Sequence, residues 1–394
     1  MANIVPALTY GIEEEFFLID PETRRLCGDR SKQLLAACRS RFGERVGEEM
    51  KACQLEVSTP ILHTATMARE SMTELRWEVD RIAQRFDVRL LAAGTHPLGD
   101  WREESHQPKA RYERLIADYR MIGSRNLLCG LHVHVGIPAG VDRVALMNRL
   151  LPWVPLFLAL STSSPFWNGT RTGLKSYRQV AYDEWPRSGT PDAFDDEAQY
   201  SGFVDLLRKH GAIEDASDLW WTIRPSSRFP TLELRIADAC TRVEDSLALA
   251  AAFRCLVRAH LRLPQLRATR TPLTRRLIEE NRWRAKRLGT QAEFIGESGD
   301  DAVSIEGMLQ ALRRLIAPDA ETLRCTGEID RLDAILAEGT SADRQLAIYR
   351  RQRDLMKSRR DAMESVVDWL ADATHALPAG QFRSVHGGSG VVNA

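Results

Sequence analysis

The sequence predicts an α+β fold with a mainly antiparallel sheet flanked by helices. Strand-like runs fall within the first 240 residues, and long helical patterns dominate afterwards. This segregation favours an antiparallel sheet over a doubly wound one, in which strands and helices alternate regularly. The expected strands are 7–19, 45–58, 87–94, 129–137, 218–224 and 231–236, and the expected helices are 31–41, 64–86, 108–124, 141–164, 242–263, 272–287, 305–315, 341–357 and 359–375.

The 394 residues are enough for one large domain or two ordinary ones. We expect a single domain at 1–376, helical from about residue 241, followed by a flexible tail at 377–394. The 54 basic residues balance the 54 acidic ones, so net charge predicts neither a nucleic-acid nor a membrane partner. The seven cysteines form no CxxC pair, and the N-terminus lacks a signal-peptide pattern. We therefore expect a reduced, cytoplasmic protein. The apolar stretch 144–160 contains Asn, Arg and two Pro residues, which predicts a buried helix.

The first expected strand carries three consecutive glutamates in apolar surroundings. Because side chains alternate along a strand, Glu13 and Glu15 share one face and Glu14 points to the other. Two carboxylates on a largely buried face need a positive partner. A divalent cation supplies one, and a salt bridge or an exposed edge strand is the alternative.

The second expected strand places Glu56 alone among apolar residues. Glu48 lies an even number of positions earlier and shares its face if the strand is regular, whereas Glu49 points the opposite way. Glu48 is therefore the expected site residue, although which of Glu48 and Glu49 is a ligand stays open. A solvated strand start is the alternative explanation for it.

The fourth expected strand carries His132 and His134 on one face, framed by small and β-branched residues. A pair of histidines on one face can bind a metal or donate hydrogen bonds to phosphate. The same pattern occurs in metal-dependent hydrolases, so alone it does not choose between these functions.

The last expected strand places Glu233 and Arg235 on one face. They are either a buried ion pair or a metal ligand beside an anion-binding guanidinium. Arg224 and Arg228 lie just upstream, next to paired tryptophans. A charged surface face is the alternative for this basic segment.

A long polar segment at 166–200 is rich in hydroxyl side chains, Gly and Pro. Its Arg171 and Arg178 suit a substrate carboxylate or phosphate, and an ordinary polar loop is the alternative. The sequence contains no phosphate-binding loop, dinucleotide fingerprint, nucleophile elbow or HExxH motif. The remaining Glu, His and Arg residues fit a nucleotide with two or three Mg²⁺ ions, because carboxylates leave Mg²⁺ positions free for phosphate oxygens.

An ordered series of motifs resembles the carboxylate–amine ligases of the glutamate–cysteine ligase 2 type. The motifs are GIEEEFFLID (11–20), QLEVSTP (54–60), GTHP (94–97), GLHVHVG (130–136), SPFWNG (164–169), WWTIRPSSRFPTLELRIADAC (220–240) and ENRW (280–283). The first, fourth and sixth are also similar, more distantly, to strands of glutamine synthetase. This resemblance implies a curved sheet, and it makes 1–376 a single catalytic domain.

The resemblance also implies a reaction and its cofactors. The expected activity joins L-glutamate to L-cysteine, giving γ-glutamylcysteine, ADP and phosphate through an acyl phosphate, with the amine acceptor open. The implied cofactors are ATP and two or three Mg²⁺ ions, with Mn²⁺ as an alternative, and the expected assembly is a homodimer or larger homo-oligomer. A metal-dependent hydrolase and an ATP-binding protein without turnover remain alternatives.

Residue roles follow from the resemblance as expectations. Glu13, His132 and Glu233 are expected to hold one metal ion, and Glu15, Glu56 and Glu48 another. Arg235 and Glu233 are the expected catalytic residues, and His134, Arg235, Arg224, Arg228, Arg171 and Arg178 are expected to bind the nucleotide and substrate. We expect Glu14→Gln to be mild and Glu13→Gln or Glu15→Gln to abolish ligation.

Overall fold

The protein is built around a seven-stranded antiparallel sheet. The computed structural model describes residues 5–266, 271–296 and 299–376. The expected tail at 377–394 lies outside the described residues. The strands run in the order β10-β11-β5-β1-β3-β2, and β4 also pairs with β1. Their bounds are β1 Tyr10–Ile19, β2 Val46–Glu48, β3 Gln54–Ser58, β4 Arg89–Leu91, β5 Leu131–Gly136, β10 Ile223–Pro225 and β11 Thr231–Leu234. The predicted α+β class is confirmed.

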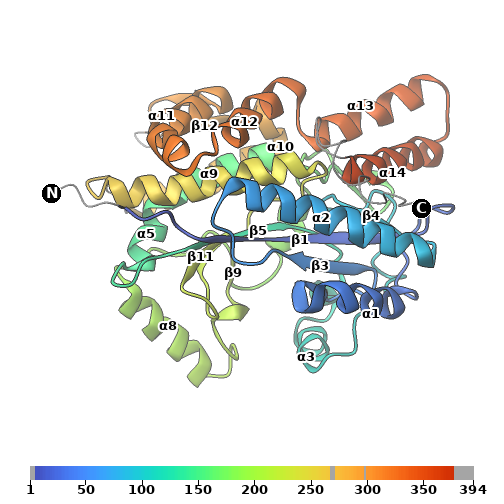
Figure 1. Cartoon of the computed structure of the whole chain (residues 1–394), viewed down its shortest axis with the longest axis horizontal. Helices are drawn as coiled ribbons and strands as arrows, with labels where there is room; N and C mark the ends of the chain where they lie inside the picture. Colours follow the sequence, from blue (N-terminus) through green and yellow to red (C-terminus); the bar gives the residue numbers. More distant parts are fainter. Residues whose placement is uncertain (1–4, 267–270, 297–298, 377–394) are drawn as a thin grey trace, which may run out of the picture.

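Helices surround the sheet, with short strand pairs and loops between them (Figure 1). They are α1 Ser31–Phe42, α2 Ala65–Ala83, α3 Ala110–Tyr119, α4 Met121–Ser124, α5 Arg143–Leu150, α6 Val154–Ser161, α7 Arg178–Tyr182, α8 Glu197–Lys209, α9 Val243–Arg262, α10 Pro272–Leu288, α11 Ile305–Leu323, α12 Thr326–Glu338, α13 Ser341–Asp354 and α14 Arg359–His375. Short pairs are formed by β6 Phe166–Trp167 with β7 Thr170–Arg171, β8 Ser188–Gly189 with β9 Trp220–Trp221, and β12 Glu293–Ile295 with β13 Ala302–Ser304.

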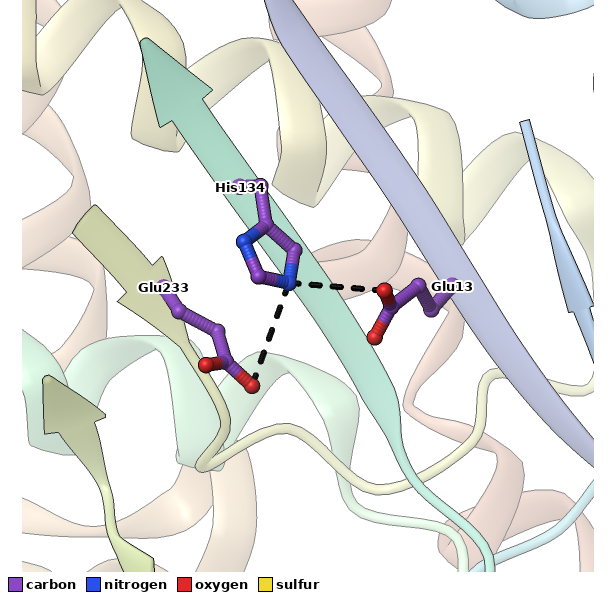
Figure 2. A group of neighbouring side chains, drawn as sticks. All are labelled: Glu13, His134 and Glu233. Carbon is purple, nitrogen blue, oxygen red and sulfur yellow. Dashed lines mark ion pairs between the residues drawn. The ribbon is translucent and has the colours of Figure 1, made fainter. Parts of the chain in front are cut away.

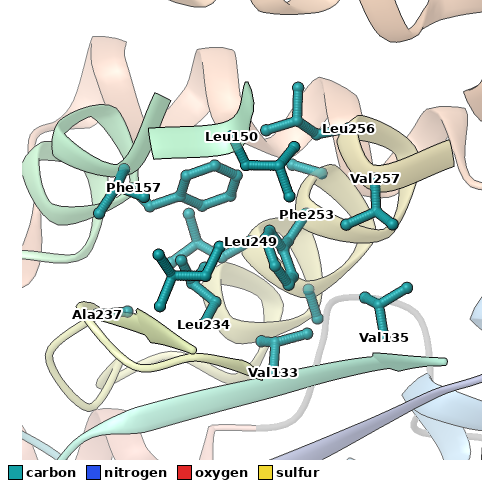
Figure 3. Close-up of a cluster of buried hydrophobic side chains, with 14 of the residues drawn as sticks. Val133, Val135, Leu150, Phe157, Leu234, Ala237, Leu249, Phe253, Leu256 and Val257 are labelled. Atoms are coloured by element: carbon teal, nitrogen blue, oxygen red, sulfur yellow. The ribbon is translucent and has the colours of Figure 1, made fainter. Parts of the chain in front are cut away.

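The apolar core lies between the sheet and α9. Val133 and Val135 of β5 belong to one buried cluster with Leu249 and Phe253 of α9 (Figure 3). Helices α11 and α12 pack on α9 from outside the sheet. Because side chains alternate along β5, its two histidines point to the face away from α9.

The register of the sheet aligns polar residues on neighbouring strands. Glu13 of β1 is paired with His132 of β5, and Glu15 of β1 is opposite Glu56 of β3. On the far side of β5, Glu233 of β11 is opposite His134. Four adjacent strands therefore present Glu and His side chains within a few ångströms of one another.

Several expected elements are divided. The expected strand 45–58 is two strands separated by a turn, and the helix 108–124 breaks at Arg120, which has φ 48°. The polar segment 166–200 contains β6, β7, α7 and the start of α8, so it is not one continuous loop. Helix α12 lies in a part of the chain for which no element was expected.

The apolar stretch is divided into α5 and α6 by a short 3-10 turn containing Pro152. By length and composition alone, Arg143–Ser161 could cross a membrane. In the structure 78% of the apolar window is buried, and Asp142 caps α5 by accepting a hydrogen bond from the Ala145 amide at 2.8 Å. The burial agrees with the expected core helix.

Candidate active site

A cavity of about 460 Å³ lies over the sheet face that carries the histidines. Many of the residues that line it are charged. The acidic lining residues are Glu13, Glu15, Glu48, Glu49, Glu56 and Glu233, the basic ones are Lys109, Arg111, Arg178, Arg224, Arg228 and Arg235, and His132 and His134 complete the set. Every site residue expected from the sequence except Arg171 therefore contributes to one cavity.

One group of possible metal ligands spans β1, β5 and β11 (Figure 2). His134 Nε2 lies 3.5 Å from an oxygen of Glu13 and 3.9 Å from an oxygen of Glu233. Burial favours neutral His134, but the hydrogen bond with Glu13 and the charge of Glu233 outweigh it and raise its pKa. The imidazole thus sits between two carboxylates, in the arrangement of a cation site.

A second group joins Glu13, Glu56 and His132. The ring of His132 is 3% exposed, and neither ring nitrogen makes a hydrogen bond of normal geometry with a described residue. Its nitrogens lie 3.5 Å from Glu13 and 3.8 Å from Glu15. Burial, reinforced by the charge of Arg235, lowers the pKa of His132 to about 4. A neutral, buried imidazole facing carboxylates is suited to binding a metal ion.

The third group contains only carboxylates, those of Glu15, Glu49 and Glu56. Burial and the charge of Glu49 raise the pKa of Glu15 to about 8, even though its carboxylate accepts a 2.6 Å hydrogen bond from the Gly130 amide. Burial, followed by the charges of Glu13 and Glu49, raises the pKa of Glu56 well above its usual value. Three carboxylates this close do not ionise together without a cation.

The donor set fits divalent metal ions. In each group the ligand atoms lie within 4.8 Å of one another, and Glu13 and Glu56 each belong to two groups, so the three groups are continuous. The donors are carboxylate oxygens and imidazole nitrogens, and carboxylates predominate. This chemistry suits Mg²⁺ or Mn²⁺ better than a thiolate-binding metal.

The grouping differs from the expected one in two respects. His134, not His132, completes the group with Glu13 and Glu233. Glu49, not Glu48, joins Glu15 and Glu56, and Glu48 instead forms a 2.6 Å ion pair with Lys109. The cause is that β2 ends at Glu48, so strand alternation does not extend to Glu49. The metal-binding roles themselves stay predictions.

Two guanidinium groups converge on Glu233. Arg224 binds its carboxylate in two contacts, at 2.8 and 3.3 Å, and Arg235 Nη1 donates to the same carboxylate. Burial alone would raise the pKa of Glu233, but Arg224 and Arg235 hold it well below its usual value. Arg235 also donates to the Tyr182 hydroxyl at 3.2 Å. Glu233 is therefore already neutralised, unlike the Glu15, Glu49 and Glu56 group.

Arg178, the first residue of α7, is 2% exposed and lies against Gly130. A Cβ atom at position 130 would lie 2.2 Å from its Nη2, so only glycine permits this close approach. The charge of Arg178 opposes the rise in the pKa of Glu15. Arg228 is exposed at the rim of the cavity, and Arg171 lies on exposed β7 outside the lining, so the structure does not bring Arg171 to the site.

Sequence reasoning missed several lining residues. Lys109, Arg111 and Tyr112 come from the start of α3 and its approach, and Tyr182 ends α7. They belong to no motif of recognised spacing. Glu49 carried a signal in its position beside Glu48, but the turn after β2 was needed to assign it.

Glu14 points to the opposite face of β1, as expected, but it is 1% exposed and paired. Arg76 of α2 donates to its two oxygens at 2.8 and 2.6 Å, and Ser246 of α9 also donates to it. Removing one partner of a buried ion pair leaves an uncompensated charge. The effect of Glu14→Gln on ligation stays a prediction, and this environment adds the prediction that the change lowers stability.

Solved structures of known ligases share this fold. A glutamate–cysteine ligase from Francisella tularensis in complex with AMP aligns with a TM-score of 0.70 at 11% identity, covering 95% of this chain and 90% of that chain. A bifunctional glutathione synthetase from Pasteurella multocida aligns with a TM-score of 0.62 at 13% identity, covering 93% of this chain and 52% of that chain. At such identities the alignments show the fold alone, which is the glutamine-synthetase-like ligase fold.

Sequence comparisons are more specific. The family model "Glutamate-cysteine ligase family 2" matches residues 9–368. A protein of Ectopseudomonas mendocina (strain ymp) named "Putative glutamate–cysteine ligase 2" is 47% identical over 375 residues, covering 95% of this chain and 98% of that protein. The chain therefore belongs to glutamate–cysteine ligase family 2.

Proposed function

We propose that this protein is an ATP-dependent carboxylate–amine ligase that forms an amide through an acyl phosphate. L-glutamate is the proposed acid and L-cysteine the proposed amine, which gives γ-glutamylcysteine, ADP and phosphate. Family membership supports the ligase class. The Francisella ligase structure, which is a complex with AMP, supports an adenine nucleotide.

The observation that carries the proposal is the charge arrangement of the cavity. The Glu15, Glu49 and Glu56 carboxylates lack an Arg or Lys ion pair within the described ranges, whereas Arg224 and Arg235 face the same space around Glu233. Such a site needs cations at one end and offers guanidinium groups to an anion at the other. ATP with divalent metal ions satisfies both requirements.

The side chains of the chain have distinct proposed roles. The carboxylate and histidine groups would hold Mg²⁺, which when bound neutralises charge on the phosphate oxygens of ATP. Arg235, positioned by the Tyr182 hydroxyl, would bind the transferred phosphoryl group, and Arg224 orients Glu233. Arg178 and Arg228 are the proposed contacts for the carboxylates of the acid substrate.

The test is ADP release by the purified protein with ATP, L-glutamate and a panel of amines that includes L-cysteine. We expect release that depends on both the acid and the amine, and that stops when EDTA removes divalent ions. An Arg171→Gln variant is the matched control, because this exposed arginine lies outside the cavity lining and should leave the rate unchanged. The absence of amine-dependent release with every acid–amine pair would overturn the proposal.

The same assay separates the alternatives. A metal-dependent hydrolase would act without ATP, and an ATP-binding protein without turnover would bind ATP and release no ADP. The geometry does not favour the hydrolase, because His132 and His134 fall in different ligand groups and each shares its group with two carboxylates. We further propose a cytoplasmic location, which the seven unbridged cysteines support. A homodimer or larger assembly stays a prediction for light scattering to check.

A further inference from the structure

Two buried cysteines outside the cavity lining face each other. Cys255 lies within α9, and Cys325 directly precedes α12. Their sulfur atoms are 3.4 Å apart, and the residues are 0% and 1% exposed. Among the described residues, no other two cysteine sulfurs are in hydrogen-bond contact. The pair joins positions 70 residues apart in the sequence.

The two thiols occupy unequal environments. Cys325 is the N-cap residue of the 13-residue helix α12, where the helix dipole favours a thiolate. The Cys255 thiol can donate a hydrogen bond to Cys325, which lowers the pKa of Cys325 despite its burial and raises that of Cys255. Its N-cap position favours Cys325 as the nucleophile, with Cys255 as its partner.

Access is available from the turn between α11 and α12. Arg324 and Thr326, on either side of Cys325, are both exposed. Arg324 has φ 52°, a left-handed conformation that is unfavourable for a residue with a side chain. Local opening of such a turn costs far less free energy than global unfolding. A small oxidant can therefore reach the sulfur of Cys325.

We propose that Cys255 and Cys325 form an oxidation site, at which a hydroperoxide converts the two thiols into a disulfide between α9 and α12. The Cys325 thiolate attacks the peroxide and becomes a sulfenic acid, and the O–O bond breaks to leave water or an alcohol. The Cys255 sulfur then attacks the Cys325 sulfur. The S–S bond forms as the S–O bond breaks, and the sulfenic oxygen leaves as water with the Cys255 proton.

The cross-link would stabilise the helical layer behind the active-site sheet. Helix α12 packs on α9, and α9 packs on β5, which carries the two histidines. A disulfide needs sulfur atoms about 2.05 Å apart, so the two helices must move slightly closer than the observed 3.4 Å between sulfurs. Closing a long chain segment restricts the unfolded state, so the oxidised protein should melt at a higher temperature.

The test treats the folded, full-length protein with hydrogen peroxide, then blocks the free thiols under denaturing conditions and maps the peptides. We expect one cross-linked peptide pair containing Cys255 and Cys325, five of the seven thiols remaining, and a Tm raised by several degrees. Thiol-reducing agents should return the original Tm. Three results would each overturn the proposal: a first cross-link between other cysteines, oxidation of Cys325 to sulfinic acid without a cross-link, or seven unchanged thiols.

Variants sharpen the result. Cys325→Ser retains a good N-cap residue and should abolish both the cross-link and the Tm rise. Cys38→Ser is the matched control, because Cys38 is also fully buried in a helix and contacts no other cysteine sulfur. It should still form the Cys255–Cys325 cross-link, and its failure to do so would contradict the assignment. The peptide map of the unaltered protein tests the proposal even if a variant folds poorly.

Discussion

The two faces of β1 carry carboxylates in opposite electrostatic situations. On the helix-covered face, Glu14 is bound by Arg76, which also donates to the carbonyls of Thr241 and Cys240. On the cavity face, Glu15 lies close to Glu49 and Glu56, and no guanidinium of the described residues binds it. Burial is similar on both faces, at 1% exposure for Glu14 and 9% for Glu15. The faces differ in whether the fold itself supplies the cation.

This difference separates structural from functional carboxylates. A buried carboxylate with its own arginine needs no ion, and its loss damages the fold. A group of carboxylates without counter-ions is unfavourable until an external cation binds, which is expected of a binding site rather than of a core. Glu233 is intermediate, because it faces the cavity but is already paired with Arg224 and Arg235.

The largest expected effect is on turnover, from Glu15→Gln. Replacing this carboxylate removes one ligand of the group that lacks its own cation, so we expect kcat/KM for ADP release to fall roughly 1000-fold. The metal-free protein should keep its Tm or gain stability, because one of three clustered acids is gone. Steady-state kinetics and thermal denaturation of the same preparation give both values. Full activity in this variant would remove Glu15 from the site.

Glu14→Gln should lower stability and spare turnover, the reverse of what we expect for Glu15→Gln. The buried Arg76 guanidinium loses its carboxylate, so the free energy of unfolding should fall by about 3 kcal/mol. Turnover per folded molecule should stay near the unaltered value at a temperature where the variant is folded. Urea denaturation followed by tryptophan fluorescence measures the loss.

A double variant tests the cause of this loss. In Glu14→Leu with Arg76→Met the charge is removed from both sides, and stability should partly recover relative to Glu14→Leu alone. Recovery stays partial because the carbonyls of Thr241 and Cys240 lose their donor. If Glu14→Gln unfolds at the same urea concentration as the unaltered protein, the buried pair does not stabilise the fold.

Glu49 and Glu48 are neighbours in sequence that allow a matched test. Glu49 belongs to the carboxylate group, so Glu49→Gln should weaken Mg²⁺-dependent activity by roughly 10- to 100-fold, the range seen when partners of a metal site are removed. Glu48 is paired with Lys109, so Glu48→Gln should change activity less than about 3-fold. Titrations of rate against Mg²⁺ concentration separate the two. Equal losses in both variants would contradict the structural grouping.

Local patterns made part of this site predictable. Side-chain alternation along β1 and β5 showed that Glu13 and Glu15 share one face and that the two histidines share one face. This was predictable because the two-residue period is a property of each strand alone. Glu49 was assigned to the wrong face, because the turn after β2 ends the alternation. Lys109 and Arg76 could not be predicted, since each meets its partner only through tertiary packing between distant segments.

The smallest expected effect links pH and Mg²⁺. The pKa of Glu15, raised to about 8 by burial and Glu49, exceeds the unfolded value, so the folded, metal-free protein holds a proton that the unfolded chain has lost. The stability gained from that proton is fully present below about pH 4.5 and is lost as pH rises through 8. Mg²⁺ replaces the proton, so the stabilisation by Mg²⁺ should be larger at pH 8.5 than at pH 6, by about 2 kcal/mol.

Thermal denaturation with MgCl₂, and with NaCl at matched ionic strength, isolates this effect from screening. Glu15→Gln is the informative control, because it removes the proton-binding carboxylate while keeping its size, and the difference between the two pH values should shrink. A Tm rise with Mg²⁺ that is equal at both pH values would mean that the cation does not bind where the carboxylates lack partners. The contrast between the two faces of β1 would then reflect packing alone.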